Sequence, residues 1–289
     1  MHWDGHAWHT LPAPSTPVLP PISSGDPTEH HGFSLLNGVA ALASDNVWAV
    51  GSIFGGDFSQ TLIEHWDGSS WQRVKSPNVA DENNQLASIS ARSANDIWAV
   101  GTSQGYEGSA LTLTEHWDGS AWSIVSSPDP SRIANALYSV AAASSDDVWA
   151  VGLMEPAETA QVSAGGYKQA RDPVLIRSDG LIVHWDGQRW QVISFPKLGN
   201  YQMLLSVTAY SSRDVWAAGL FVVEGNQGQV FQGLLEHWDG STWQSTEDTH
   251  AQYIRGIATS AAGGLWSVGL TVPPPNSGGA EQAVAEACT

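Results

Sequence analysis

The chain has 289 residues, of which 29 are acidic and only 11 are Lys or Arg, so its formal net charge is −18 at pH 7. Nucleic acids and anionic membrane surfaces are not expected as partners, because both require a basic protein surface. No apolar run approaches the roughly 20 residues of a spanning helix, so no membrane insertion is expected.

Tryptophan sets the pattern of the chain, because its 15 copies fall into three repeating columns. The first column is the Trp of His-Trp-Asp-Gly, the second lies five residues later, and the third is the Trp of a Trp-Ala-Val-Gly type motif. The columns are Trp3, Trp66, Trp117, Trp185 and Trp238; Trp8, Trp71, Trp122, Trp190 and Trp243; and Trp48, Trp98, Trp149, Trp216 and Trp266. One unit thus recurs five times with a period of 50 to 68 residues, which predicts a propeller or a similar array.

Each unit predicts four short strands. The first two have the patterns seen in Leu36–Ala41 and Val47–Gly51, and the last two those of Thr61–Trp66 and Trp71–Val74, with an Asp-Gly turn between them. Four-stranded sheets repeated radially are the blades of a propeller. The expected fold is therefore all-β, a five-bladed β-propeller with four antiparallel strands per blade and almost no helix.

The five units predict one domain that covers residues 1–289. Blades 1 to 4 cover residues 36–75, 86–126, 137–194 and 204–247. The closing blade takes its outer strands from residues 1–11 and its inner strands from residues 253–271. Residues 272–289 form a tail. The ring would close where N- and C-terminal strands share one blade, which removes exposed sheet edges.

The tail offers an alternative for this closing blade. Residues 284–288 could form a degenerate third strand, which would leave only the fourth strand to the N-terminus. We expect instead that the tail is loose and that the N-terminus supplies both outer strands.

The glycine that ends the second strand, the aromatic residue of the third and the Trp that opens the fourth resemble the kelch-repeat and galactose-oxidase-like propellers. The corresponding glycines are Gly51, Gly101, Gly152, Gly219 and Gly269. The resemblance covers nearly the whole chain, but each unit has one glycine where kelch repeats usually have two. No copper-ligand set of Tyr and His is present, so no catalytic residue carries over. The chain is also similar to Trp-rich repeat arrays of predicted extracellular bacterial proteins.

Loop lengths vary only in the connections that emerge on one face, where strand two joins strand three and where one blade joins the next. Rigid scaffolds commonly carry function on such loops. The longest insertions are Leu11–Leu35, which contains His30 and His31, and Leu153–Gly180 in the third blade. The candidate ligand-binding residues of this face are Tyr106, Tyr138, Tyr167, Lys168, Arg171, Arg177, Tyr201, Tyr253 and Arg255.

Catalytic and metal-binding patterns do not stand out. The five histidines of the His-Trp-Asp-Gly motifs belong to separate blades, so they cannot share a metal, and we expect each to bond to the Asp of its own turn. The inner strands carry no acid, and the loop acids Asp81, Glu82, Asp129, Glu247 and Asp248 form no marked pair. No catalytic residue, metal or cofactor is therefore predicted.

Three functions stay open: a non-catalytic binding domain for a glycan or protein ligand, which we favour, a glycoside hydrolase or other enzyme with a site at the propeller axis, and an architectural unit of a cell-surface assembly. Basic side chains in an acidic protein would select an acidic partner. We expect a monomer with an extracellular or cell-surface location, although the chain shows no signal peptide.

Overall fold

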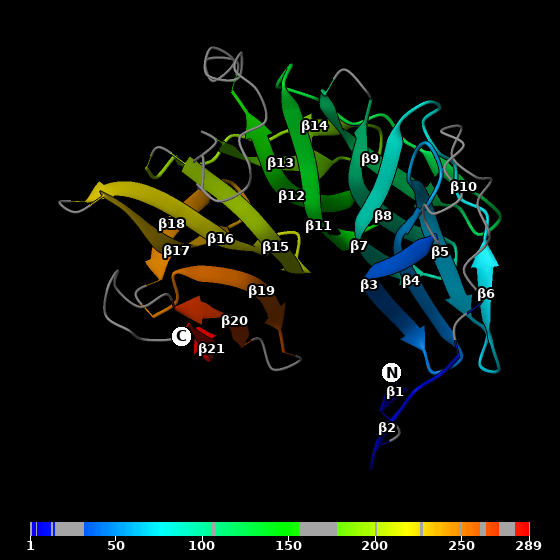
Figure 1. Ribbon diagram of the computed structural model, residues 1–289. Coiled ribbons are helices and arrows are strands. Elements are labelled where there is room, and N and C mark those ends of the chain that lie inside the picture. The colour runs from blue at the N-terminus through cyan, green and yellow to red at the C-terminus, as the bar shows by residue number, and fades with distance from the viewer. Residues whose placement is uncertain are drawn as a thin grey trace.

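The computed structural model describes residues 2–3, 5–12, 14, 32–105, 108–156, 178–199, 201–225, 228–248, 250–260, 264–271 and 281–288. All regular structure in these ranges is β, as the sequence predicts (Figure 1). None of the described residues belongs to a helix that could cross a membrane.

Four groups of four antiparallel strands follow one another along the chain, and we call them sheets 1 to 4; a parallel bridge between Ala134 and Ala110 joins sheets 2 and 3 into one eight-stranded sheet. Sheet 1 consists of β3 (Phe33–Ala43), β4 (Asn46–Phe54), β5 (Gln60–Trp66) and β6 (Trp71–Val74). Sheet 2 consists of β7 (Asn83–Ser93), β8 (Asp96–Gln104), β9 (Ala110–Trp117) and β10 (Trp122–Ile124). Sheet 3 consists of β11 (Ala134–Ser144), β12 (Asp147–Glu155), β13 (Asp179–Trp185) and β14 (Trp190–Val192). Sheet 4 consists of β15 (Tyr201–Ser211), β16 (Asp214–Gly225), β17 (Gly228–Trp238) and β18 (Trp243–Asp248).

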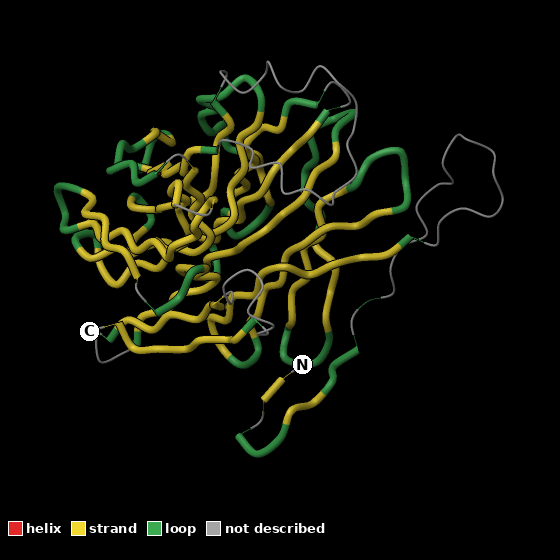
Figure 2. The backbone as a smooth tube through the Cα atoms, turned by 60° about the vertical axis from the view of Figure 1, so that its left-hand side comes forward, coloured by secondary structure: helices red, strands yellow, loops and turns green. Residues whose placement is uncertain are grey.

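Two smaller units lie at the ends of the chain. Sheet 5 has three strands, β19 (Tyr253–Thr259), β20 (Leu265–Thr271) and β21 (Gln282–Cys288). The hairpin β1 (His2–Trp3) and β2 (Trp8–His9) forms a two-stranded sheet of its own, which projects from the body of the molecule (Figure 2). The shared closing blade expected from the sequence is therefore not formed in this structure.

The tail strand corrects one expectation. Residues 282–288 are not loose, because β21 pairs with β20 and places Ala287 opposite Trp266. In sheet 1 the same register places His65 opposite Trp48. The segment Gln-Ala-Val-Ala-Glu-Ala-Cys therefore occupies the position of Gln-Thr-Leu-Ile-Glu-His-Trp, and the Gln and Glu that it keeps mark it as a degenerate third strand.

The five sheets follow one another in an arc, with their first strands innermost. Strands β3, β7, β11, β15 and β19 are neighbours in that order (Figure 1). Within the described residues, β19 and β3 do not pack against each other as those neighbours do, so the arc is open.

Apolar clusters fill the boundaries between successive sheets. Trp48 and Val50 of sheet 1 pack with Leu86 and Ile89 of sheet 2, and equivalent residues form the next two boundaries. A single sheet cannot bury both of its faces, so stacking of neighbouring repeats provides the core.

Candidate functional site

Every inner strand contains a β-bulge at the same place. In β11 the pairing with β12 shifts between Leu137 and Ser139, which leaves Tyr138 as the extra residue. The corresponding residues of the other inner strands are Asn37, Ala87, Leu205 and Arg255. Bulges release one residue from the strand ladder and often occur beside functional sites. Two of the candidate residues from the sequence, Tyr138 and Arg255, occupy this position.

The repeated glycine of the second strand lies opposite the bulge. A Cβ atom on Gly152 would lie 1.9 Å from the carbonyl oxygen of Ala136, a separation that no packing allows. The same conflict, at 1.9–2.0 Å, exists at Gly51, Gly101, Gly219 and Gly269. The glycine column of the sequence is therefore required by the close approach of two backbones.

Three tyrosines lie on the inner strands of successive sheets. Tyr201 begins β15 and Tyr253 begins β19, while Tyr138 is the bulge residue near the middle of β11. All three are partly buried, and burial raises the pKa of each phenol. The charge of Tyr201 raises the pKa of Tyr138 and of Tyr253 as a second cause. We call Tyr138, Tyr201 and Tyr253 the tyrosine cluster.

The surroundings of the cluster include two residues that sequence reasoning missed. Phe231 of β17 stacks on Tyr253, with ring centroids 5.2 Å apart and an interplanar angle of 23°. A hydrogen bond with Ser178 partly offsets the raised pKa of Tyr201. Ser178 lies near the end of the third-blade insertion, so this end of the insertion contacts the tyrosine cluster. Neither contact has a signal in the repeat, because Phe231 and Ser178 lie outside its motifs.

Charge near the cluster comes from Arg255 and Glu281. Arg255 is exposed, and its positive charge lowers the pKa of Tyr253, whereas Glu281 acts in the opposite direction; both effects are smaller than that of burial. The site therefore combines aromatic rings and phenol hydroxyl groups with one accessible guanidinium. Such a combination can stack on a ligand, donate hydrogen bonds to it and bind a carboxylate.

The structure describes four of the candidate residues, Tyr138, Tyr201, Tyr253 and Arg255, on the neighbouring inner strands β11, β15 and β19. The other five lie outside the described residues: Tyr106, Tyr167, Lys168, Arg171 and Arg177. His30 and His31, which the sequence offered as weak metal candidates, also lie outside them.

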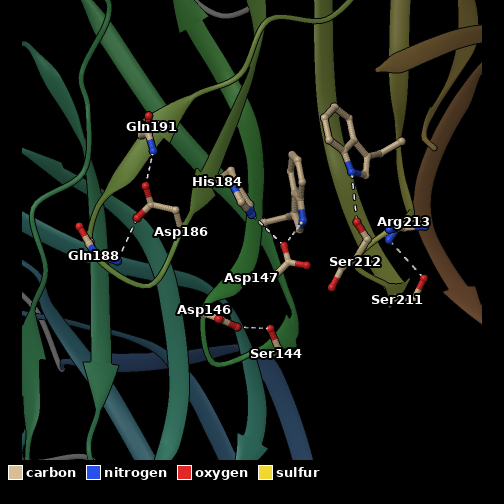
Figure 3. A network of polar contacts seen from close by, with 12 residues as sticks. Ser144, Asp146, Asp147, His184, Asp186, Gln188, Gln191, Ser211, Ser212 and Arg213 are labelled. Carbon is tan, nitrogen blue, oxygen red and sulfur yellow. Dashed lines mark hydrogen bonds and ion pairs between the residues drawn. The ribbon is translucent and has the colours of Figure 1, made fainter. Parts of the chain in front are cut away.

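The repeated histidines do not bond to the Asp of their own turn, which corrects the sequence-based expectation. His184 Nε2 lies 2.8 Å from Oδ1 of Asp147, at the start of the neighbouring strand β12 (Figure 3). The other three described contacts follow the same rule and are His65–Asn46, His116–Asp96 and His237–Asp214, at 2.9–3.0 Å. The pairing register explains the error, because His184 faces Trp149 across the strands, two residues from Asp147.

The turn Asp has a different role. In sheet 3 the carboxylate of Asp186 accepts a hydrogen bond from the backbone N–H group of Gln188 (Figure 3) and another from that of Arg189, both at 2.9 Å. The equivalent bonds to Asp118, with that of Ser120 Oγ, lower its pKa to about 2. Both the His and the Asp of the motif thus stabilise the fold, as expected, through separate contacts.

Buried glutamates of the third strands are a feature that the sequence analysis did not identify. Glu64, Glu115 and Glu236 precede the repeated His, and each has one buried carboxylate oxygen without a hydrogen-bond partner among the described residues. Desolvation raises the pKa of Glu115 to about 8 and of Glu236 to about 7, although hydrogen bonds from Ser76 and Ser245 partly oppose this. They come from separate sheets, so they do not form a catalytic carboxylate pair.

Asp129, one of the loop acids, makes contacts that recur in another sheet. Asp129 accepts hydrogen bonds from the backbone N–H and the hydroxyl group of Thr112, at 2.7 and 3.1 Å. Asn78 makes the equivalent contacts with Thr61 in sheet 1. Because an amide serves equally well there, we interpret Asp129 as a structural residue.

Two further features lie outside the tyrosine cluster. His250 Nδ1 lies 3.3 Å from Glu286 Oε2 and 3.8 Å from Asp248 Oδ1, so this trio links β21 to the end of sheet 4. A groove of about 440 Å³ lies between sheets 2 and 3, where Trp185, Trp190 and Arg189 line it with Val125–Pro128 and Gln188. Both tryptophans already pack against Trp98, which makes the groove a by-product of sheet stacking.

No family model matches the sequence, and none of the curated proteins matches it. Among solved structures, the chain is similar to YCF48 bound to a D1 peptide, with a TM-score of 0.46 and 15% sequence identity. The alignment covers 89% of this chain and 70% of that one. A likeness of this degree assigns no function.

Proposed function

We propose that this protein is a non-catalytic recognition domain that binds an acidic glycan or protein ligand at the tyrosine cluster. The observation that carries the proposal is the gathering of Tyr138, Tyr201, Tyr253 and Arg255 from three successive sheets. A β scaffold supports these side chains, and Ser178, near the end of the third-blade insertion, is hydrogen-bonded to Tyr201. Arg255 supplies a positive charge that would select a carboxylate in an otherwise acidic protein.

Binding of the intact protein to a glycan array and to immobilised acidic peptides tests the proposal. For a ligand found in this way, Tyr201→Ala and Arg255→Gln should each weaken binding at least tenfold. Tyr210→Ala is the matched control, because Tyr210 is an exposed aromatic residue on the same strand, about 30 Å further along it. Equal losses in Tyr201→Ala and Tyr210→Ala would contradict the proposed site.

The enzyme and architectural alternatives predict different results. Turnover of chromogenic glycosides that is abolished in Tyr201→Ala would indicate an enzyme. An absence of binding to every glycan and peptide, together with self-assembly of the purified chain, would indicate an architectural unit. We also propose an extracellular or cell-surface location for this recognition domain.

We further propose that the five sheets are the blades of one closed, monomeric propeller of the kelch-like type. Sheets 1 and 5 each expose apolar residues that are buried at the other boundaries. Val39 of β3 is 69% exposed and Trp266 of β20 is 53% exposed. Their counterparts Ile89 and Trp48 are buried in one cluster between sheets 1 and 2. Closure would place Trp266 and Val268 against Leu36 and Val39, and so would bury all four.

Mutation of the end sheets tests this closure. Trp266→Ala should lower the free energy of unfolding by about 3–5 kcal/mol in a closed ring, the usual cost for a buried aromatic residue. In an open arc the cost would stay within about 0.5 kcal/mol, as is usual for surface substitutions. Denaturant unfolding of the two proteins decides between these outcomes.

A further inference from the structure

The boundary between sheets 4 and 5 has two acidic residues where the boundary between sheets 1 and 2 has a Ser and a Glu. Each of sheets 1 to 4 carries two outer tryptophans, the first ending its third strand and the second opening its fourth. Five residues after the second outer Trp comes Ser76 in sheet 1 and Asp248 in sheet 4. Ser76 Oγ donates a hydrogen bond of 2.8 Å to Glu115 of sheet 2.

Glu286 of β21 holds in sheet 5 the position that Glu115 holds in sheet 2. Each lies opposite the residue that follows the third-column Trp, which is Ala99 for Glu115 and Ser267 for Glu286. Asp248 therefore brings a second carboxylate to this boundary in place of a hydroxyl donor. The equivalent positions at the other two boundaries hold at most one acid, namely Ser127 with Val183 and Phe195 with Glu236. Two neighbouring carboxylates repel each other unless a positive charge lies near both.

His250 completes the group and supplies a nitrogen ligand. It takes the place of Asn78 in sheet 1, seven residues after the second outer Trp. Its Nδ1 atom lies 3.3 Å from Glu286 Oε2 and 3.8 Å from Asp248 Oδ1. One ligand atom from each of the three residues lies within 4.8 Å of the other two. At usual bond lengths, the ligand atoms of a tetrahedral Zn²⁺ ion are about 3.4 Å apart. Small side-chain rotations therefore bring all three atoms to an ion.

The burial of the three residues suits an ion that is fixed on one side and open to water on the other. The side chain of Asp248 is only 6% exposed, and its Oδ1 atom accepts hydrogen bonds from the backbone N–H groups of His250 and Ala251, at 2.7 and 3.2 Å. Glu286 Oε1 is buried and has no hydrogen-bond partner among the described residues. Buried polar atoms are normally paired, and an ion bound to this carboxylate satisfies it. His250 is 74% exposed, so water can supply the remaining ligand.

We propose that Asp248, His250 and Glu286 form a binding site for a divalent transition-metal ion, of which Zn²⁺ fits the ligands best. One imidazole nitrogen and two carboxylate oxygens are ligands that Zn²⁺ commonly takes. Ca²⁺ is not expected, because it prefers a larger shell made of oxygen ligands. The ion joins β21 to the end of β18 and so fastens the last described strand to sheet 4. This proposal is independent of the tyrosine cluster, and its tests require no ligand at that site.

Titration of the metal-free, untagged protein with ZnCl₂ tests the proposal. The parent protein carries Cys288→Ser, which removes the only thiol of the chain. Calorimetry should show binding of one ion per chain. The Tm in Zn²⁺ should exceed the Tm in EDTA, because an ion that binds only the folded state stabilises it. CaCl₂ at the same concentration should leave the Tm unchanged. Absence of Zn²⁺ binding, or an equal effect of Ca²⁺, would overturn the proposal.

Two ligand variants locate the ion. Loss of a residue that merely supports a metal ligand typically weakens binding about 10–100-fold. His250→Ala and Glu286→Gln, which remove ligands, should therefore weaken Zn²⁺ binding at least about tenfold. Folding is not at risk in His250→Ala, because this side chain is mostly exposed. Glu247→Gln is the matched control, since Glu247 is an exposed acid next to Asp248 on β18, and it should bind Zn²⁺ like the parent. Unchanged affinity in His250→Ala would place the ion elsewhere and overturn the assignment.

Asp248→Ser tests the comparison between the repeats. It restores the pair of Ser and Glu that Ser76 and Glu115 form in the first two sheets. Zn²⁺ should raise the Tm of the parent protein and leave that of Asp248→Ser unchanged. An equal rise in both proteins would show that Asp248 is not a ligand. If Zn²⁺ raises neither, a charged His250 alone neutralises the two acids, and the metal site does not exist.

Discussion

The hydroxyl group of Ser76 donates a hydrogen bond of 2.8 Å to Oε2 of Glu115 across the boundary between sheets 1 and 2. The other oxygen of this fully buried carboxyl group has no partner among the described residues. Burial consequently raises the pKa of Glu115 from 4.5 to about 8, so that the folded protein favours the protonated acid.

Stability should therefore decrease as the pH rises. A carboxyl group whose pKa is raised by folding contributes to the free energy of unfolding in full below its unfolded pKa near 4.5. This contribution is lost progressively as the pH rises toward 8. Glu115→Gln, which stays neutral, should be the more stable protein at pH 8 by about 1–3 kcal/mol, the typical cost of an unsatisfied buried group. Urea unfolding at pH 4.5 and 8 checks this. The exposed carboxylate variant Asp57→Asn should retain the pH dependence of the parent protein, and a parallel pH profile for Glu115→Gln would refute the prediction.

The third-column tryptophans should dominate the stability of the core. Trp98 is 2% exposed and contacts both outer tryptophans of sheet 3. Its replacement by Ala should cost about 3–5 kcal/mol. Ile124→Ala, at an exposed site on β10, should cost less than about 0.5 kcal/mol. Calorimetry or denaturant unfolding measures both, and similar values for the two variants would contradict the packing described here.

The close backbone approach at the repeated glycines can be tested with two glycines, one in β8 and one in the loop that follows it. Gly101→Ala would place a Cβ atom 1.9 Å from the carbonyl oxygen of Gln85, so the bulge in β7 must rearrange. We expect a loss of more than about 3 kcal/mol, in the range of severe overpacking. A Cβ atom on Gly105 has only the flexible side chain of Glu82 nearby, at 3.9 Å, and Gly105→Ala should be nearly neutral. Equal melting temperatures for the two variants would rule out this explanation of the column.

The cross-strand His–Asp contact can be distinguished from a contact within the motif by a double-mutant cycle. His116→Ala and Asp96→Ala should be coupled by about 0.5–1.5 kcal/mol, because the two side chains are bonded at 2.9 Å. His116→Ala and Asp118→Ala should be additive, since Asp118 bonds to its own turn. Coupling of His116 to Asp118 alone would restore the expectation drawn from the sequence.

The sequence predicted the strands well, because each is marked by a repeated pattern of Trp, Val and Gly. The register was harder to foresee. The spacing of His116 and Asp118 suggested a contact along one strand, whereas antiparallel pairing brings in Asp96 from the neighbouring strand. The buried Glu115 was missed because a single acid within an apolar strand reads as a solvent-facing residue.

The candidate site stays a prediction. Tyr138, Tyr201, Tyr253 and Arg255 were selected because they lie in or beside loops on one face, and the structure describes them on three neighbouring inner strands. Phe231 and Ser178 could not be found in this way, since their contacts depend on how sheets 3, 4 and 5 are turned toward one another. The expected loose tail was wrong because β21 retains enough of the repeat to pair with β20.

The bulge in the inner strands has a consequence for how such a protein can change its specificity. The extra residue has no cross-strand partner, so its identity is not constrained by the ladder, and Asn, Ala, Tyr, Leu and Arg all occur there. Each repeat therefore has one variable position, while the strand structure around it stays the same. In the proposed binding role, a new ligand preference would arise by single substitutions, one repeat at a time, while the glycines and tryptophans around each position continue to maintain the fold.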